Sequence, residues 1–176
     1  MSEEGKIADS ANLALVDDWS RDFYSQFKDW RLPNARFAWS TWEPGYLLLD
    51  VTLVRDGELS EPASVYSADE ELTFATRVWH DHSPHWDFPE TEASVYVKDL
   101  AHRWFGGKFK IATYYLADAW KGSLTIPEDA DVQTALIEGL AWVRKNFDAD
   151  RVELKGPFRS EDEVFGIAAN GIGFKS

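Results

Sequence analysis

The sequence contains no cysteine among its 176 residues. Disulfide bonds, thiolate nucleophiles and cysteine-ligated zinc sites are therefore excluded. The sequence also has no apolar run near the ~20 residues that a membrane span needs, and its polar, acidic first residues lack the apolar stretch of a signal peptide. We therefore expect a cytoplasmic protein.

Basic residues are scarce, with 18 lysines and arginines against 31 aspartates and glutamates, which gives a net charge of −13. Such a charge repels phosphate backbones and anionic lipids, so we expect neither nucleic acid nor membrane as a partner. The charge is uneven, because residues 35–100 carry 13 acids and four bases while residues 101–176 carry 11 acids and ten bases. The middle third is predicted to present an acidic face to a basic protein. Solubility alone is the alternative explanation.

Aromatic residues are abundant, with nine tryptophans, eleven phenylalanines and six tyrosines. A chain of this length can bury a sizeable core, and aromatic side chains fill much of such a core. Nine tryptophans are still many for one core of this size. We therefore expect some of them on a surface that a partner covers.

The hydrophobic pattern predicts one α+β domain over residues 1–176, with residues 1–9 as a flexible tail. Apolar residues at steps of three and four predict helices near residues 10–31, 91–105 and 130–147. In the first helix the apolar stripe consists of Val16, Trp19, Phe23, Phe27 and Trp30. We expect this stripe to be core, with a partner groove as the alternative.

Alternation with a period of two predicts antiparallel strands at several places along the chain. They fall near residues 37–41, 46–54, 59–66, 72–79, 108–116, 123–126 and 151–154. The segment from Gly156 is expected to be a loop with one helical turn near residues 160–165. We expect an α+β fold in which an antiparallel sheet of about five or six strands has the three helices packed mainly on one face.

Three of the four histidines lie within six residues, in a segment that leaves the fourth predicted strand. The segment also contains two tryptophans and two aspartates, and reads Trp79-His80-Asp81-His82-Ser83-Pro84-His85-Trp86-Asp87. Scattered residues seldom collect in this way, so the segment is a candidate for chemistry or for partner binding.

Metal binding is one use of such a segment. The spacing of His80, His82 and His85 matches three ligands of the H-x-H-x-D-H signature of metallo-β-lactamase-fold hydrolases, but Pro84 stands where that signature has aspartate. We therefore do not assign that family and expect no bound metal or other cofactor. A different site that uses His80, His82 and His85 stays the alternative, because residues two apart on a strand point to the same side.

Catalysis is a second use. Either His80 or His82 next to Asp81 or Asp87 has the composition of a general base with an orienting carboxylate. The sequence has no G-x-S-x-G nucleophile motif, no P-loop and no dinucleotide-binding glycine pattern. A small metal-dependent or His/Asp-based enzyme is therefore the second hypothesis, and a non-inhibitory adaptor is the third.

Protein binding is the use that we favour, because aromatic side chains within an acidic surface suit a partner that is basic. A leading amphipathic helix, a strand meander, the Trp79-His80-Asp81-His82 stretch and a following helix resemble, over about residues 35–126, the small acidic immunity proteins of bacterial polymorphic toxin systems. The resemblance implies an inhibitor that neutralises a toxin domain, often a basic nuclease. No single inhibitory residue follows from it.

The residues expected to bind the partner come from the histidine segment and from the acidic turns before it. They are Trp79, His80, Asp81, His82, His85, Trp86, Asp87, Glu58, Glu61, Asp69, Glu70 and Glu71.

Overall fold

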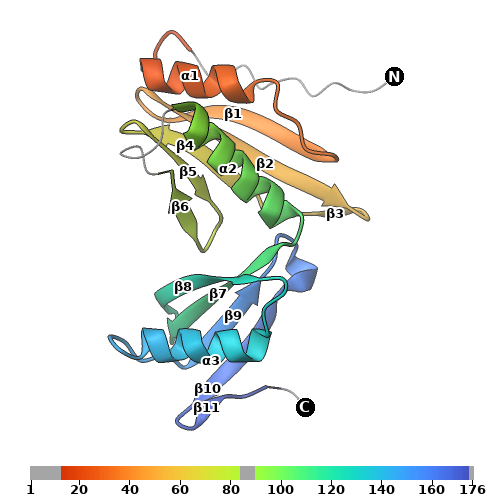
Figure 1. The fold of residues 1–176 in the computed structure, drawn as a ribbon, viewed down its shortest axis with the longest axis vertical. Coiled ribbons are helices and arrows are strands. Elements are labelled where there is room, and N and C mark those ends of the chain that lie inside the picture. The colour runs from red at the N-terminus through yellow and green to blue at the C-terminus, as the bar shows by residue number, and fades with distance from the viewer. Residues whose placement is uncertain (1–12, 84–89, 175–176) are drawn as a thin grey trace. The chain divides into compact units, whose positions relative to one another are not determined.

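A computed structural model describes residues 13–83 and 90–174. Over these residues the chain forms three α-helices and two antiparallel sheets, which confirms the α+β class (Figure 1). The expectation of one sheet is wrong, because the strands before helix α2 (Glu90–Phe105) and those after it pair only among themselves. The chain divides into two compact units, Met1–His102 and Arg103–Ser176. The single domain expected from the sequence stays a prediction.

The first unit holds a six-stranded antiparallel sheet in the order β1-β2-β4-β5-β6, with β3 paired to β2. Its strands are β1 (Ala35–Glu43), β2 (Tyr46–Arg55), β3 (Glu58–Leu59), β4 (Ala63–Ala68), β5 (Glu71–Ala75) and β6 (His80–His82). The short connections between consecutive strands produce the meander that the alternating pattern predicts.

Helix α1 (Asp18–Phe27) is shorter than predicted, because the Asp17 side chain accepts a hydrogen bond from Ser20 N at 2.7 Å and caps the helix there. Phe23 and Phe27 are buried, as expected. Trp19 is only half-buried, and its Nε1 donates to Glu71 O at 3.2 Å.

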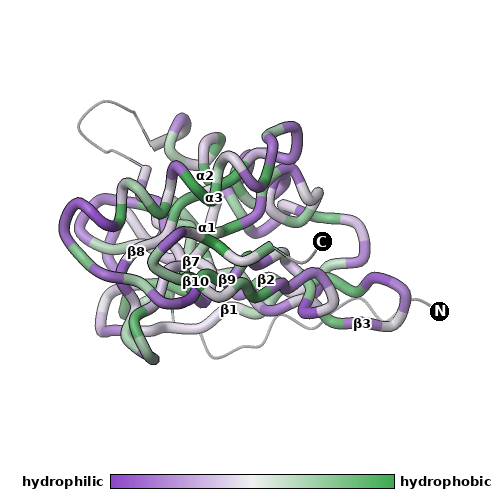
Figure 2. The backbone as a smooth tube through the Cα atoms, turned by 90° about the horizontal axis from the view of Figure 1, so that it is seen from below, coloured by the Kyte–Doolittle hydropathy of each residue, from purple (hydrophilic) through white to green (hydrophobic). Residues whose placement is uncertain are grey.

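The strand register shows which face of the sheet the helices cover. Trp39, Leu49, Val65, Phe74 and Asp81 lie opposite one another across the five strands from β1 to β6. The α1 residues Phe23 and Tyr24 contact Trp39, and Tyr96 of α2 contacts Asp81, so both helices lie on this inner face. Figure 2 shows the two helices on one side of β1 and β2. We call the opposite side of the sheet the outer face.

The second unit holds a five-stranded antiparallel sheet in the order β11-β10-β9-β7-β8. Its strands are β7 (Phe109–Leu116), β8 (Ala119–Pro127), β9 (Arg151–Lys155), β10 (Glu163–Ala168) and β11 (Gly171–Ile172). Helix α3 (Val132–Val143) packs Leu136 and Leu140 against Tyr114 of β7. The third predicted helix therefore covers a different sheet from the first.

The segment after Gly156, for which the sequence predicts a loop with one helical turn, contains two strands. The single turn of 3-10 helix, Arg159–Glu161, is present where a helical turn was predicted, but β10 and β11 follow it. Phe165 lies opposite Val152 of β9 and packs against the core with Ile167. The alternation of apolar and other residues in β10 and β11 is short and lies among glycines and acidic residues, so it predicts a strand only weakly.

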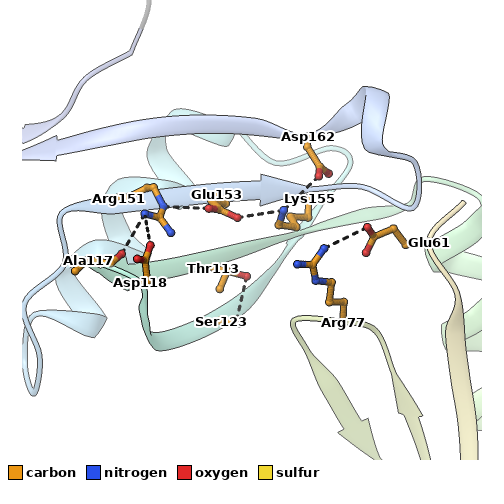
Figure 3. Close-up of polar contacts among 10 residues, drawn as sticks. All are labelled: Glu61, Arg77, Thr113, Ala117, Asp118, Ser123, Arg151, Glu153, Lys155 and Asp162. Atoms are coloured by element: carbon orange, nitrogen blue, oxygen red, sulfur yellow. Dashed lines mark hydrogen bonds and ion pairs between the residues drawn. The ribbon is translucent and has the colours of Figure 1, made fainter.

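The face of this second sheet that lies away from α3 carries a row of paired charges along β9 (Figure 3). Glu153 lies between Arg151 and Lys155, at 3.0 Å and 3.1 Å, and Lys155 also contacts Asp162 at 3.3 Å. Burial alone would lower the pKa of Lys155, but its bonds to Glu153 and Asp162 outweigh burial and raise it. These charges therefore neutralise one another within the unit.

Candidate functional site

The histidine segment is partly regular rather than wholly irregular. Residues 80–82 form β6, the edge strand of the first sheet, and His82 lies opposite Thr73 of β5. His80 and His82 are exposed on the outer face with ring centroids 5.0 Å apart, which confirms that they point to the same side. His85, Trp86 and Asp87 lie outside the described residues.

His82 is held by β5 through a single ring nitrogen. Its Nδ1 lies 2.8 Å from Thr73 Oγ1 and 3.3 Å from Glu71 Oε2. A proton relay needs a histidine to use both of its ring nitrogens, one toward the nucleophile and one toward the carboxylate. Because both partners share Nδ1, and Thr73 is buried, this trio lacks the geometry of a nucleophilic triad.

Asp81 points to the opposite face from the two histidines. Its Oδ2 accepts a hydrogen bond of 2.6 Å from the Tyr96 hydroxyl, and its Oδ1 accepts one from His82 N at 3.0 Å. Asp81 therefore ties the edge strand to helix α2. It does not orient His80 or His82, as one form of the catalytic hypothesis expects, and the alternative carboxylate, Asp87, lies outside the described residues.

We predict that Tyr96→Phe lowers the free energy of unfolding of the first unit by about 1–2 kcal/mol, because a half-buried carboxylate loses its donor. Amide hydrogen exchange of β5 and β6, followed by NMR, measures the change locally. Asp99→Asn is the matched control on the exposed side of α2. Equal exchange rates in Tyr96→Phe and the unmodified protein would show that this bond does not hold β6.

The predicted acidic residues do not form one cluster. Glu58 lies in β3 beside Arg55, at one end of β2, and Glu61 follows it and contacts Arg77 at 3.5 Å. Asp69 and Glu70 form the turn between β4 and β5, beside Tyr46 at the other end of β2. The candidate set therefore divides between the two ends of the sheet.

Trp79 lies toward the same end of the sheet as Glu61. Its backbone carbonyl accepts hydrogen bonds from Thr76 N and Thr76 Oγ1. Its ring is half-buried, 6.4 Å from the ring of Phe74 in the core. Much of Trp79 is therefore used for packing within the unit.

The structure brings together three aromatic rings that the sequence did not single out. Trp42 is stacked on Tyr46 with ring centroids 6.1 Å apart and meets Tyr66 edge-on at 5.1 Å. Trp42 keeps 42% of its surface exposed. The Tyr46 hydroxyl donates to Asp69 Oδ1 at 2.9 Å, and Glu70 is exposed beside it. We call Trp42, Tyr46, Tyr66, Asp69 and Glu70 the aromatic–acidic surface.

One sequence signal for this surface existed. A hairpin turn at Pro44-Gly45 places Glu43 opposite Tyr46, and the alternation of β2 and β4 puts Tyr46 and Tyr66 on one face. Trp42 lies two residues after Ser40, which is opposite Leu48 on this same face, so the alternation of β1 places Trp42 there as well. The register shift between Thr41 and Glu43, which alternation alone does not predict, leaves Trp42 without a residue directly opposite it in β2.

The turn that carries the two carboxylates is conformationally unfavourable. Asp69 and Glu70 have φ angles of 49° and 63°, the left-handed region that hairpin turns normally fill with Asn-Gly. A residue with a side chain pays about 1 kcal/mol to adopt it. Residues held in such conformations gather at functional sites.

The electrostatic potential around Tyr46 is negative. The hydrogen bond to Asp69 and the charge of that carboxylate raise the pKa of the Tyr46 phenol, and the charge of Asp17 adds to the effect. An excess of negative charge extends over the whole first unit. Met1–His102 contains 20 acidic and eight basic residues, a net charge of −12, whereas Arg103–Ser176 contains 11 and ten, a net charge of −1.

Within residues 13–83 and 90–174, no group of three or more His, Asp or Glu side chains is arranged to hold a metal ion.

In the second unit, a cleft of about 440 Å³ is lined by the β10–β11 hairpin and by Asp150. The Asp150 carboxylate accepts a hydrogen bond from Ala117 N at 2.8 Å. Apart from this structural carboxylate, Asn170 is the one polar side chain among the described residues that line the cleft.

Comparisons with protein-family models, with curated proteins and with solved structures found no match for this chain. None of the helices in the described ranges has the length and apolar character that crossing a bilayer requires.

Proposed function

We propose that this chain is a protein-binding inhibitor that neutralises a basic partner, such as the toxin domain for which it would be the immunity protein in a bacterial toxin system. The observation that carries the proposal is the aromatic–acidic surface: an exposed tryptophan supported by two tyrosines, next to two carboxylates at a hairpin tip. Aromatic anchors supply much of the affinity of protein interfaces. Carboxylates around them steer a basic partner and pair with its charges.

The charge distribution supports the same function. Eight bases cannot neutralise 20 acids, so the first unit keeps a large negative excess that attracts a basic protein. In the second unit, by contrast, acids and bases nearly balance. An acidity needed for solubility alone has no reason to be confined to one unit.

The turn provides a way to separate binding from folding. We predict that Asp69→Asn with Glu70→Gly slows association with the partner about fivefold to tenfold at low salt, because two steering charges are lost. The free energy of unfolding should stay equal or rise by about 1 kcal/mol, because Asn-Gly suits the left-handed turn. The natural test partner would be the product of a neighbouring gene that encodes a basic protein. Stopped-flow association at two salt concentrations measures the rates, and growth of cells that express the partner measures neutralisation.

The matched control is Asp56→Asn, which removes an exposed carboxylate from another left-handed turn of the same unit, φ 52°, at the opposite end of β2. It should change the association rate less than twofold by this argument from local steering. The reverse pattern, with Asp56→Asn slowing association and the Asp69–Glu70 variant leaving it unchanged, would move the interface to the other end of the sheet.

A further inference from the structure

We infer that the aromatic–acidic surface takes an arginine side chain of its partner, with the guanidinium against the Trp42 indole and its N–H groups directed to Asp69 and Glu70. This inference rests on the proposed function and names the side chain that the proposed site recognises. It is carried by the geometry of the rings and carboxylates together.

The rings form a platform for a cation. A cation over the face of tryptophan is attracted by the electron density of the ring, and tryptophan is the strongest of the aromatic residues in this respect. Trp42 is fixed in place by three contacts. It stacks on Tyr46 at an interplanar angle of 29°, meets Tyr66 edge-on, and donates from Nε1 to Ser67 O at 3.4 Å. A fixed ring loses little conformational entropy when a ligand covers it.

The carboxylates favour a ligand that can stack and donate hydrogen bonds at the same time. Tyr46 holds Asp69 through Oδ1, which leaves Oδ2 to accept another donor, and Glu70 adds a second exposed carboxylate. A guanidinium is planar, stacks on aromatic faces and presents five donors in its plane, whereas an ammonium is a compact and strongly hydrated charge. The arrangement therefore favours arginine over lysine.

The test uses two short peptides of glycine and serine that differ only in carrying two arginines or two lysines, titrated into the full chain and followed by NMR. The Trp42 indole N–H resonance is identified among the nine tryptophans by its loss in Trp42→Phe. We expect the arginine peptide to move this resonance and to bind roughly fivefold more tightly than the lysine peptide. In Trp42→Leu the two peptides should bind equally, because the carboxylates attract both.

Two controls separate this effect from general charge and exposure. Asp56→Asn and Trp120→Ala change an exposed carboxylate of the first unit and an exposed tryptophan of the second, and both should keep the arginine preference. Tyr46→Phe should reduce it, because Asp69 loses the hydrogen bond that positions it.

Equal binding of the two peptides to the unmodified chain, or a Trp42 resonance that does not move, overturns the inference. Any neutralisation of a basic partner would then depend on charge alone. If the arginine peptide binds preferentially at Trp42 but the chain neutralises no basic partner, the proposed inhibitory function is contradicted. The arginine-binding site itself would then still be supported.

Discussion

Replacing Phe23 with alanine should lower the free energy of unfolding of the first unit by about 3–5 kcal/mol, the usual cost of removing a buried phenylalanine. The Phe23 side chain is 2% exposed on the inner face of the six-stranded sheet. Its ring meets Phe27 edge-on at 4.8 Å and Trp39 at 5.1 Å, so its loss leaves a cavity between α1 and β1. Because the chain has two units, amide exchange of β2 and β4 is a better measure than one global unfolding curve.

Leu15→Ala is the matched control for Phe23→Ala. Leu15 is 72% exposed just before α1, so its truncation should cost less than about 0.5 kcal/mol. If Phe23→Ala also cost less than about 1 kcal/mol and partner binding disappeared, the helix stripe would be an interface rather than core.

The stripe containing Phe23 shows what the sequence could predict well. Steps of three and four identified the buried side of α1. Val16, which precedes the helix, and Trp30, which follows it, are buried as well. Burial depends on where each side chain points, so the prediction of buried residues can be correct even where the predicted helix is too long. The start of the helix differs from the prediction because the cap at Asp17, not the apolar pattern, sets the first turn.

The division into two sheets could not be predicted in the same way. A period of two shows that a segment is a strand with one face buried, but it does not say which strand lies next to it. Both β5 and β7 have strong strand patterns on either side of α2, yet each pairs only within its own sheet. Pairing depends on contacts between residues distant in the sequence, and local periodicity carries no information about them.

The candidate site illustrates both a success and a failure. Exposed His80 and His82 share one face as the strand geometry predicted, and Asp69 and Glu70 are exposed at a turn. Clustering in the sequence, however, also makes Asp81 and Trp79 candidates for partner binding. In the structure Asp81 bonds to α2, and Trp79 packs against the core. The aromatic–acidic surface is assembled from β1, β2, β4 and the turn that follows, so it exists only after the sheet has formed.

Replacing Gly139 with alanine should destabilise the second unit by about 2 kcal/mol, although alanine favours a helix by about 1 kcal/mol over glycine. Gly139 lies on the buried side of α3. A methyl group there would overlap Tyr114 Oη and Leu124 Cδ2 and would lie 3.1 Å from Tyr114 Cζ. Tyr114 cannot yield easily, because it is fully buried and its hydroxyl donates to Leu136 O at 2.8 Å. Amide exchange of β7 and β9 measures the loss.

A second substitution shows whether this hydroxyl is the obstacle. Tyr114→Phe alone should cost about 1 kcal/mol, because one buried hydrogen bond is lost. Combined with Gly139→Ala, it should cost less than the sum of the two single changes by about 1 kcal/mol, because the alanine methyl then has room where the oxygen was. Glu138→Ala, on the exposed side of the same helix, controls for helix propensity and should be neutral or slightly stabilising. Strict additivity of Gly139→Ala and Tyr114→Phe would place the obstacle at Leu124 instead, and a stabilising Gly139→Ala would mean that α3 packs differently against its sheet.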